Sequence, residues 1–260
     1  MEKRIAFINN KGGCGKSTSL FHVAGELAGR GYSVLVIDAD KQCDTSNNLL
    51  SEEESGWDEK DKTLLDFLMG KADLSEVLKM NFIKVGNKKP DYFGIDVIPA
   101  DKRLEKQSLL KDLDARGKFD LSYDFILIDC PPSNRAIEKI VLEQIADSVI
   151  VPMTPDLNTV RGYGAVVNKI DKARENNPDL KVLGIFFSRF KKNRRKDEEY
   201  REMMLNNFPD TFIDVQIPDC TAVSSSIEDK GQPIRFYKKS IAKEPYERLV
   251  DDIIDRVEND

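Results

Sequence analysis

The sequence predicts an α/β fold, a doubly wound and mostly parallel sheet with helices on both faces. Short continuous apolar runs recur along the chain, as expected for strands that are covered on both sides. Segments with helical spacing separate these runs, which favours parallel strands joined by helices. A glycine-rich turn, residues 11–18, joins the first run to the first helix. The expected strands are residues 4–9, 33–38, 95–99, 125–129, 148–152, 182–187 and 214–217.

We expect one domain, residues 1–260, because no linker or internal repeat divides the chain. No run approaches the roughly 20 apolar residues of a membrane span, and no signal-peptide core precedes the first strand, so a cytoplasmic location is expected. The four cysteines form no C-x-x-C pair and are expected to be free thiols, which counts against an iron–sulfur carrier. The net charge of −6 predicts no general affinity for nucleic acid, so such affinity needs a local basic patch.

Two polar segments and one amphipathic helix complete the expected layout. Residues 51–62 are expected to form an acidic surface loop, and residues 84–92 a turn. Residues 245–257 have apolar side chains at helical spacing and an acidic opposite face. A helix lying on a membrane would present Lys and Arg on that face. We therefore expect this helix to pack on the domain, and we expect no membrane partner.

The turn at residues 11–18, Lys-Gly-Gly-Cys-Gly-Lys-Ser-Thr, has the chemistry of a phosphate-binding loop. Glycines let successive backbone N–H groups point at one anion, and the following helix adds its N-terminal N–H groups. Lys16 can reach the outer phosphates of a nucleotide, and the Ser17 hydroxyl can bind Mg²⁺. A chance glycine- and lysine-rich turn is the alternative. The residues expected to bind the nucleotide here are Lys11, Gly12, Gly13, Cys14, Gly15, Lys16, Ser17 and Thr18.

Carboxylates stand at the ends of two expected strands, and ligands of parallel sheets bind beyond such ends. Asp38 and Asp40 lie at one strand end, and Asp129 lies at another. Carboxylates there can hold Mg²⁺ directly or through water and can orient an attacking water. Ser17, Asp38 and Asp129 are therefore the expected metal ligands. A solvated acidic turn is the alternative for the first pair.

The loop resembles that of the ParA/MinD family of ATPases, which have a P-loop NTPase-like fold. The common loop is G-x-x-x-x-G-K-[ST], but Asn10 stands here at the first glycine and Lys11 adds a second lysine. In the family this extra lysine reaches across a dimer to the partner's nucleotide. The resemblance thus implies catalytic roles for Lys11 and Lys16, and implies that Asp40 positions the attacking water.

The resemblance continues past the second strand and near the C-terminal end. The family's D-x-D-P-Q-G-N motif is matched at both aspartates and the glutamine, but Lys41 replaces proline and Cys43 replaces glycine, which puts the shape of this loop in question. Residues 215–220 resemble the segment that lines the adenine, which implies base contacts for Pro218 and Cys220. A proline that only ends a strand is the alternative. His22, the one histidine, has no partner in a catalytic motif and is expected to be a core or surface residue.

One basic segment contrasts with the acidic chain. The residues expected to contact DNA are Arg189, Lys191, Lys192, Arg194, Arg195 and Lys196. Lys and Arg bind phosphates without sequence preference, although three acidic residues follow and a solvated, self-paired helix face is the alternative. A second cluster comprises Arg235, Lys238, Lys239 and Lys243. Partition ATPases of the family bind DNA through basic residues in this third of the chain.

The resemblance implies a ParA-like ATPase for DNA partition that uses ATP and Mg²⁺. The expected cycle has an ATP-dependent sandwich dimer that binds DNA non-specifically on the nucleoid. A ParB-like centromere-binding protein stimulates hydrolysis and releases the dimer. Two alternatives stay open: a related ATPase that positions another cargo or the division site, and a nucleotide-gated DNA-binding regulator.

Overall fold

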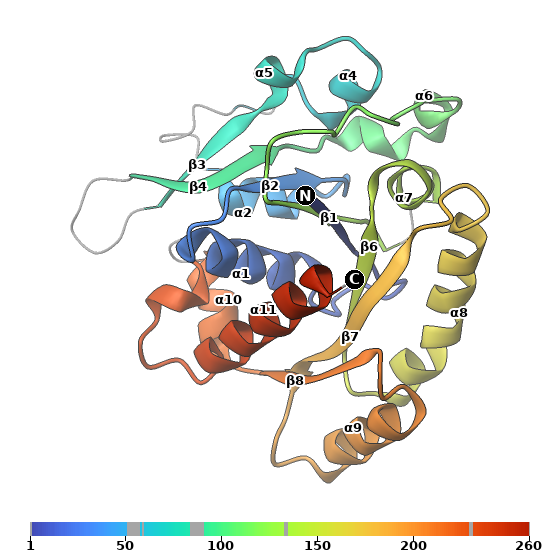
Figure 1. The fold of residues 1–260 in the computed structure, drawn as a ribbon. Coiled ribbons are helices and arrows are strands. Elements are labelled where there is room, and N and C mark those ends of the chain that lie inside the picture. Colours follow the sequence, from blue (N-terminus) through green and yellow to red (C-terminus); the bar gives the residue numbers. More distant parts are fainter. Residues whose placement is uncertain are drawn as a thin grey trace.

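Eight strands form one sheet in the described part of the chain, in the order β3-β4-β2-β5-β1-β6-β7-β8 (Figure 1). The computed structural model describes residues 2–50, 58, 60–83, 91–132, 135–228 and 231–259. β3 is antiparallel to β4, and the other neighbouring strands are parallel. The strands are β1 (Lys3–Phe7), β2 (Val34–Asp38), β3 (Lys79–Ile83), β4 (Asp91–Ile98), β5 (Phe125–Asp129), β6 (Ser148–Met153), β7 (Lys181–Phe190) and β8 (Phe212–Pro218).

Helices cover both faces of the sheet (Figure 1). The α-helices are α1 (Lys16–Gly29), α2 (Asp44–Leu49), α4 (Leu64–Leu68), α5 (Leu74–Val77), α6 (Gln107–Leu110), α7 (Arg135–Ile140), α8 (Leu157–Ala173), α9 (Arg195–Asn207), α10 (Thr221–Glu228) and α11 (Lys243–Glu258). Short 3₁₀ turns are η1 (Lys102–Glu105) and η3 (Ile234–Phe236), and a π-helical turn, η2 (Val141–Ile145), extends α7. The doubly wound, mostly parallel prediction is confirmed.

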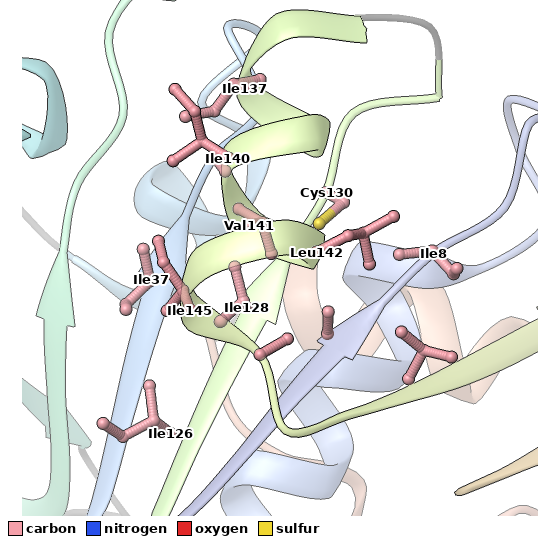
Figure 2. Close-up of a cluster of buried hydrophobic side chains, with 14 of the residues drawn as sticks. Ile8, Ile37, Ile126, Ile128, Cys130, Ile137, Ile140, Val141, Leu142 and Ile145 are labelled. Carbon is pink, nitrogen blue, oxygen red and sulfur yellow. The ribbon is translucent and has the colours of Figure 1, made fainter. Parts of the chain in front are cut away.

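Alternate residues of each strand enter two separate apolar cores. Ile5 and Phe7 pack with α1 and α11, whereas Ala6 and Ile8 pack on the other face with α7, η2 and α8. Figure 2 shows the second core, in which Ile137, Ile140 and other side chains of α7 and η2 lie against the strands. Because both faces are buried, the central strands are almost entirely apolar.

The sequence missed β3. Its residues, Lys-Met-Asn-Phe-Ile, lack a continuous apolar run, because an edge strand is covered less than a central one. The prediction of a turn at residues 84–92 is wrong for its last two residues, because Asp91 and Tyr92 begin β4. The other residues of this expected turn, 84–90, lie outside the described part. The loop expected at residues 51–62 is described only at residue 58 and residues 60–62, which form a turn and a bend.

The terminal helix packs as predicted. Tyr246, Leu249, Val250, Ile253 and Val257 of α11 are buried in the core that α1 shares. No helix within the described ranges is both long enough and apolar enough to cross a membrane.

The segment before α11 is docked closely on α1. Gly25 faces the ring of Pro233, and a Cβ added at Gly25 would lie 2.2 Å from it. The Arg235 guanidinium lies over Gly29, donates to its carbonyl at 3.0 Å and pairs with the Glu26 carboxylate at 3.1 Å. Arg235, which the sequence groups with Lys238, Lys239 and Lys243, is therefore already paired with Glu26 of α1. This docking holds the helix that begins at the phosphate loop.

His22 was expected to be either a core or a surface residue, and it lies in the core. It is fully buried on α1. Its Nδ1 accepts from the Ile234 backbone N–H at 3.1 Å, and its Nε2 lies 3.3 Å from the Val223 carbonyl, so Nε2 is the protonated nitrogen. Burial lowers the pKa of His22 to about 3. The ring is thus a neutral link between α1, α10 and η3.

Candidate active site

The phosphate-binding loop lies between β1 and the first turn of α1. Gly13 and Gly15 have φ of 71° and 82°, a left-handed backbone that glycine adopts without strain. α1 has no side-chain cap at its start, so its first N–H groups are open to an anion. Lys16 is only 7% exposed, although it carries a charge. A glycine-rich loop with a buried lysine, followed by an uncapped helix, is suited to a phosphate chain.

Asp38 and Asp129 end two neighbouring strands and are paired in register. Both are buried. Asp38 accepts from the Ser46 hydroxyl at 2.6 Å and from the Asp40 backbone N–H at 3.0 Å. Burial raises the pKa of Asp38, and the nearby Asp129 charge raises it further. Burial also raises the pKa of Asp129, against the opposing effect of the Ser17 and Thr45 hydroxyls. A bound cation would stabilise the ionised form of these two buried, neighbouring carboxylates.

The residues present fit Mg²⁺. Oδ1 of Asp129 is buried and has no hydrogen-bond partner in the described part, while Oδ2 accepts from Thr45 at 2.6 Å. No three His, Cys, Asp or Glu side chains form a metal cluster within the described ranges. Mg²⁺ keeps several waters and commonly takes one or two carboxylates together with substrate phosphates. Ser17 and Asp129, with Asp38 behind them, supply that kind of oxygen set.

The loop after β2 keeps a tight turn in spite of its two departures. Cys43, which stands at the family's glycine, has φ of 59°, and its N–H donates to the Asp40 carbonyl at 2.9 Å. The left-handed conformation costs a non-glycine residue about 1–2 kcal/mol. Lys41 pairs with Glu105 at 2.7 Å. Asp40 is partly exposed, and its charge helps to raise the pKa of Asp129.

A cavity of about 300 Å³ opens beside the loop. Gly13, Gly15 and Thr18 line one side, and Pro218 and Cys220 line the other. The structure thus brings the residues assigned to the base next to those assigned to the phosphates. Pro218 both ends β8 and lines this cavity, so its two readings are compatible.

Lys11 contacts a different part of the molecule from Lys16. Its Nζ lies 2.7 Å from the Asp156 carboxylate and 3.1 Å from the Thr159 hydroxyl, both at the start of α8. Partial burial would raise the pKa of Asp156, yet hydrogen bonds from Lys11, Thr154 and Thr159 hold it well below its usual range. The Lys11 side chain remains 46% exposed. Within a single subunit, Lys11 therefore lies outside the cavity beside the phosphate loop.

The basic segment is exposed at each of its six cationic residues. Four of them pair with carboxylates: Arg189 and Lys191 with Asp219, Arg194 with Asp197, and Arg195 with Glu199. Lys192 and Lys196 form no ion pair within the described part. Arg194 and Arg195 thus fit the self-paired alternative, while the two free lysines fit a phosphate-binding surface. Arg189 lines the cavity beside the phosphate loop.

Several contributors to the site were not singled out from the sequence. Thr45 and Ser46 orient the two carboxylates. Ser188 donates to the Cys14 carbonyl at 2.6 Å and so supports the phosphate loop. Thr154 and Asp156 hold Lys11. Ser188 directly follows the expected strand 182–187, and Thr154 directly follows Met153, where β6 ends, so the strand-end rule could have indicated them.

Parallel strands that end in a phosphate loop and a pair of magnesium-type carboxylates define the nucleotide hydrolases of the P-loop class. A family model described as an AAA domain matches residues 2–182. The chain belongs to this family and, within it, to the ParA/MinD ATPases.

Relatives and solved structures resemble the chain over nearly its whole length. The chromosome partitioning protein ParA of Caulobacter vibrioides is 29% identical over 265 residues, which cover 97% of this chain and 94% of the relative. The chromosome-partitioning ATPase Soj of Treponema pallidum is 29% identical and covers 98% of each chain. A putative plasmid partition protein of Borrelia burgdorferi, solved bound to AMPPNP, has a TM-score of 0.75 and 25% identity, and covers 100% of this chain and 99% of its own.

Proposed function

We propose that the chain is a ParA-like ATPase for DNA partition. One observation carries this proposal: Lys16 is buried at the start of α1, whereas Lys11, the other lysine of the loop, is half-exposed and contacts Asp156 and Thr159 at the start of α8. An ATPase acting alone needs only the first. An exposed second lysine beside the site is suited to a nucleotide held by another copy of the chain. The partition proteins among the relatives support the biological role.

Within one subunit, each residue has a distinct task. Lys16 and the loop N–H groups bind the phosphates of ATP, and Ser17, Asp38 and Asp129 hold Mg²⁺ directly or through water. The metal neutralises charge on the transferring phosphoryl group. Asp40 positions the attacking water. Catalysis is mainly positioning and charge stabilisation, as in other phosphoryl transfers.

Dimerisation gives Lys11 its second site. In the single chain its charge is balanced by Asp156 and two threonine hydroxyls. In an ATP-bound sandwich dimer the partner's phosphates replace these groups, in the manner of an arginine finger supplied in trans. The half-exposed position of Lys11 makes this exchange possible without unfolding the loop.

The dimer holds DNA through the exposed basic residues, among them Lys192 and Lys196. A dimer doubles the phosphate contacts of one chain, so ATP switches binding on. A ParB-like partner stimulates hydrolysis and releases the dimer from the nucleoid in the cytoplasm.

The test is ATP turnover and duplex binding by the purified full chain. We expect retention on unrelated duplexes of the same length with ATP but not with ADP, and weak turnover that a centromere-binding protein encoded beside this gene accelerates. Sequence-independent binding that needs ATP, without any turnover, would favour a nucleotide-gated regulator. ATP-dependent dimers that ignore DNA would favour an ATPase that positions another cargo.

A further inference from the structure

Arg189 stands apart from the basic segment to which its sequence position assigns it. It is the next-to-last residue of β7 and lines the cavity beside the phosphate loop, together with Gly13 and Pro218. Its Nη1 donates to the Gly13 carbonyl at 3.4 Å, and its Nε lies 3.7 Å from the Asp219 carboxylate. The guanidinium therefore lies between the loop that receives phosphates and the wall assigned to the base.

The backbone explains this placement. Consecutive side chains of a strand point to opposite faces. Ser188 and Arg189 are consecutive, yet the first bonds the Cys14 carbonyl and the second the Gly13 carbonyl. Arg189 has φ of 56°, a conformation that L side chains rarely adopt. This left-handed residue breaks the alternation and brings both side chains to the same loop.

The present partners hold the guanidinium only weakly. Both contacts are long, the side chain is 61% exposed, and Asp219 has a nearer partner in Lys191 at 3.2 Å. An arginine offers five donors in a planar fork that matches phosphate oxygens. Most of these donors are unused within the described residues.

We propose that Arg189 binds the nucleotide of its own subunit, with the guanidinium donating to the phosphate nearest the ribose, and that it does not belong to the DNA surface. Thr18 lines the same cavity, so the ribose end of the phosphate chain enters between Thr18 and Arg189. This inference rests on the ATP-binding part of the proposed function and not on its DNA part. The ligand class is a nucleoside di- or triphosphate.

The test is the affinity of the full chain for fluorescent mant-ADP with Mg²⁺, and for adenosine by competition. Arg189→Ala should weaken mant-ADP binding about tenfold, the loss of one charge-assisted contact, and leave adenosine binding unchanged. Arg116→Ala is the matched control, since Arg116 is 58% exposed and pairs with Asp114. Arg189→Gly, which suits the left-handed backbone, should weaken mant-ADP binding equally, which separates the lost guanidinium from backbone strain.

Two results would overturn the inference. One is unchanged mant-ADP affinity in both Arg189 variants. The other is a loss of duplex affinity in Arg189→Ala at saturating ATP, which would return Arg189 to the DNA surface. If the parent chain itself binds no mant-ADP, the proposed function fails and this inference fails with it.

Discussion

Charged side chains occupy two neighbouring regions of the molecule in opposite ways. At the strand ends Asp38 and Asp129 are buried and accept hydrogen bonds from Ser46 and Thr45, and Lys16 is buried at the start of α1. In the segment from Lys191 to Lys196 every charge is exposed. A buried charge that loses its partner has no water to replace it, whereas an exposed ion pair contributes little. We therefore expect that each buried charged residue at the strand ends has its own effect when it is replaced, and that replacements in the basic segment act only through the total charge.

Replacing Lys16, in the buried region, should have the largest effect, and that effect should be on ATP binding. Lys16→Ala removes the buried lysine of the phosphate loop and should weaken ATP binding more than about a hundredfold. Lys11→Ala should retain nucleotide binding but lose ATP-dependent dimerisation and turnover. Calorimetry and size-exclusion chromatography with ATP measure the two properties. Equal loss of nucleotide binding in both variants would contradict the division of tasks between the lysines.

Replacing Asp40 should have the next largest effect. Because Asp40 lies at the rim of the buried region, this variant tests where the difference between buried and exposed charges begins. Asp40→Ala should bind ATP and dimerise, while phosphate release falls by about a hundredfold, the usual size of a lost proton acceptor or water-orienting group. Asp44→Ala, which removes an exposed carboxylate from the first turn of α2, directly after this loop, serves as the control. A steady-state rate equal to the parent's would show that another group positions the water.

In the basic segment, only total charge should matter. Reversing both Arg194 and Arg195 to Glu should weaken binding to all duplexes alike by about thirtyfold and flatten the log–log salt dependence. Nucleotide binding and dimerisation should be unaffected. Anisotropy titrations at several salt concentrations, with ATP and with ADP, measure this. If affinity does not change, these two arginines only pair with Asp197 and Glu199, and Lys238 and Lys239 become the next residues to replace.

His22 extends the comparison to a buried group that titrates. Its folded-state pKa of about 3 lies below the unfolded value of about 6.5, so unfolding takes up a proton between these values. The contribution of His22 to the free energy of unfolding is therefore fully present above pH 6.5. Below that pH it declines by up to about 1.4 kcal/mol per pH unit, which is a tenfold change in the unfolding constant. Urea titrations between pH 7.5 and 5 test this. His22→Gln should be less stable at pH 7.5 but should lose this part of the pH slope, and an unchanged slope would assign it to other groups.

The smallest effect should be on stability in the exposed region. The Arg195–Glu199 pair lies on α9 at a spacing of four residues, and Arg195 is 92% exposed. Arg195→Ala should change the free energy of unfolding by less than about 0.5 kcal/mol, since such pairs are solvated and screened. A loss above about 1 kcal/mol in urea denaturation would mean that exposed charges here also act singly.

Regular features of the fold were predictable because they follow from local pattern. Apolar runs indicated seven strands, and the strand-end rule predicted that residues 38 and 129 would meet, which they do in register. β3 was missed because an edge strand needs no apolar run. The tasks of individual site residues stay predictions, since a position beside the loop is not itself a role.

Contacts made by long-range packing were not visible in the sequence. Lys11 is held by α8, about 145 residues away along the chain, so no local pattern indicates its partners. Arg189 was grouped with its charged neighbours because arginine gives no signal of a left-handed backbone. Arg235 was grouped in the same way, although Glu26 holds it against α1. Charge clusters in a sequence therefore need a structure before they are assigned to one surface.

The contact between Gly25 and Pro233 has a consequence for how this sequence can diverge. Any side chain at position 25 would overlap the proline ring, because even a methyl group would lie 2.2 Å from it. Position 25 can thus accept a side chain only after position 233 has changed to glycine, because both the Cβ and the Cγ of Pro233 lie within 2.3 Å of the added atom. A lineage that substituted Gly25 first would displace the segment around Pro233 from α1, the helix that begins at the phosphate loop.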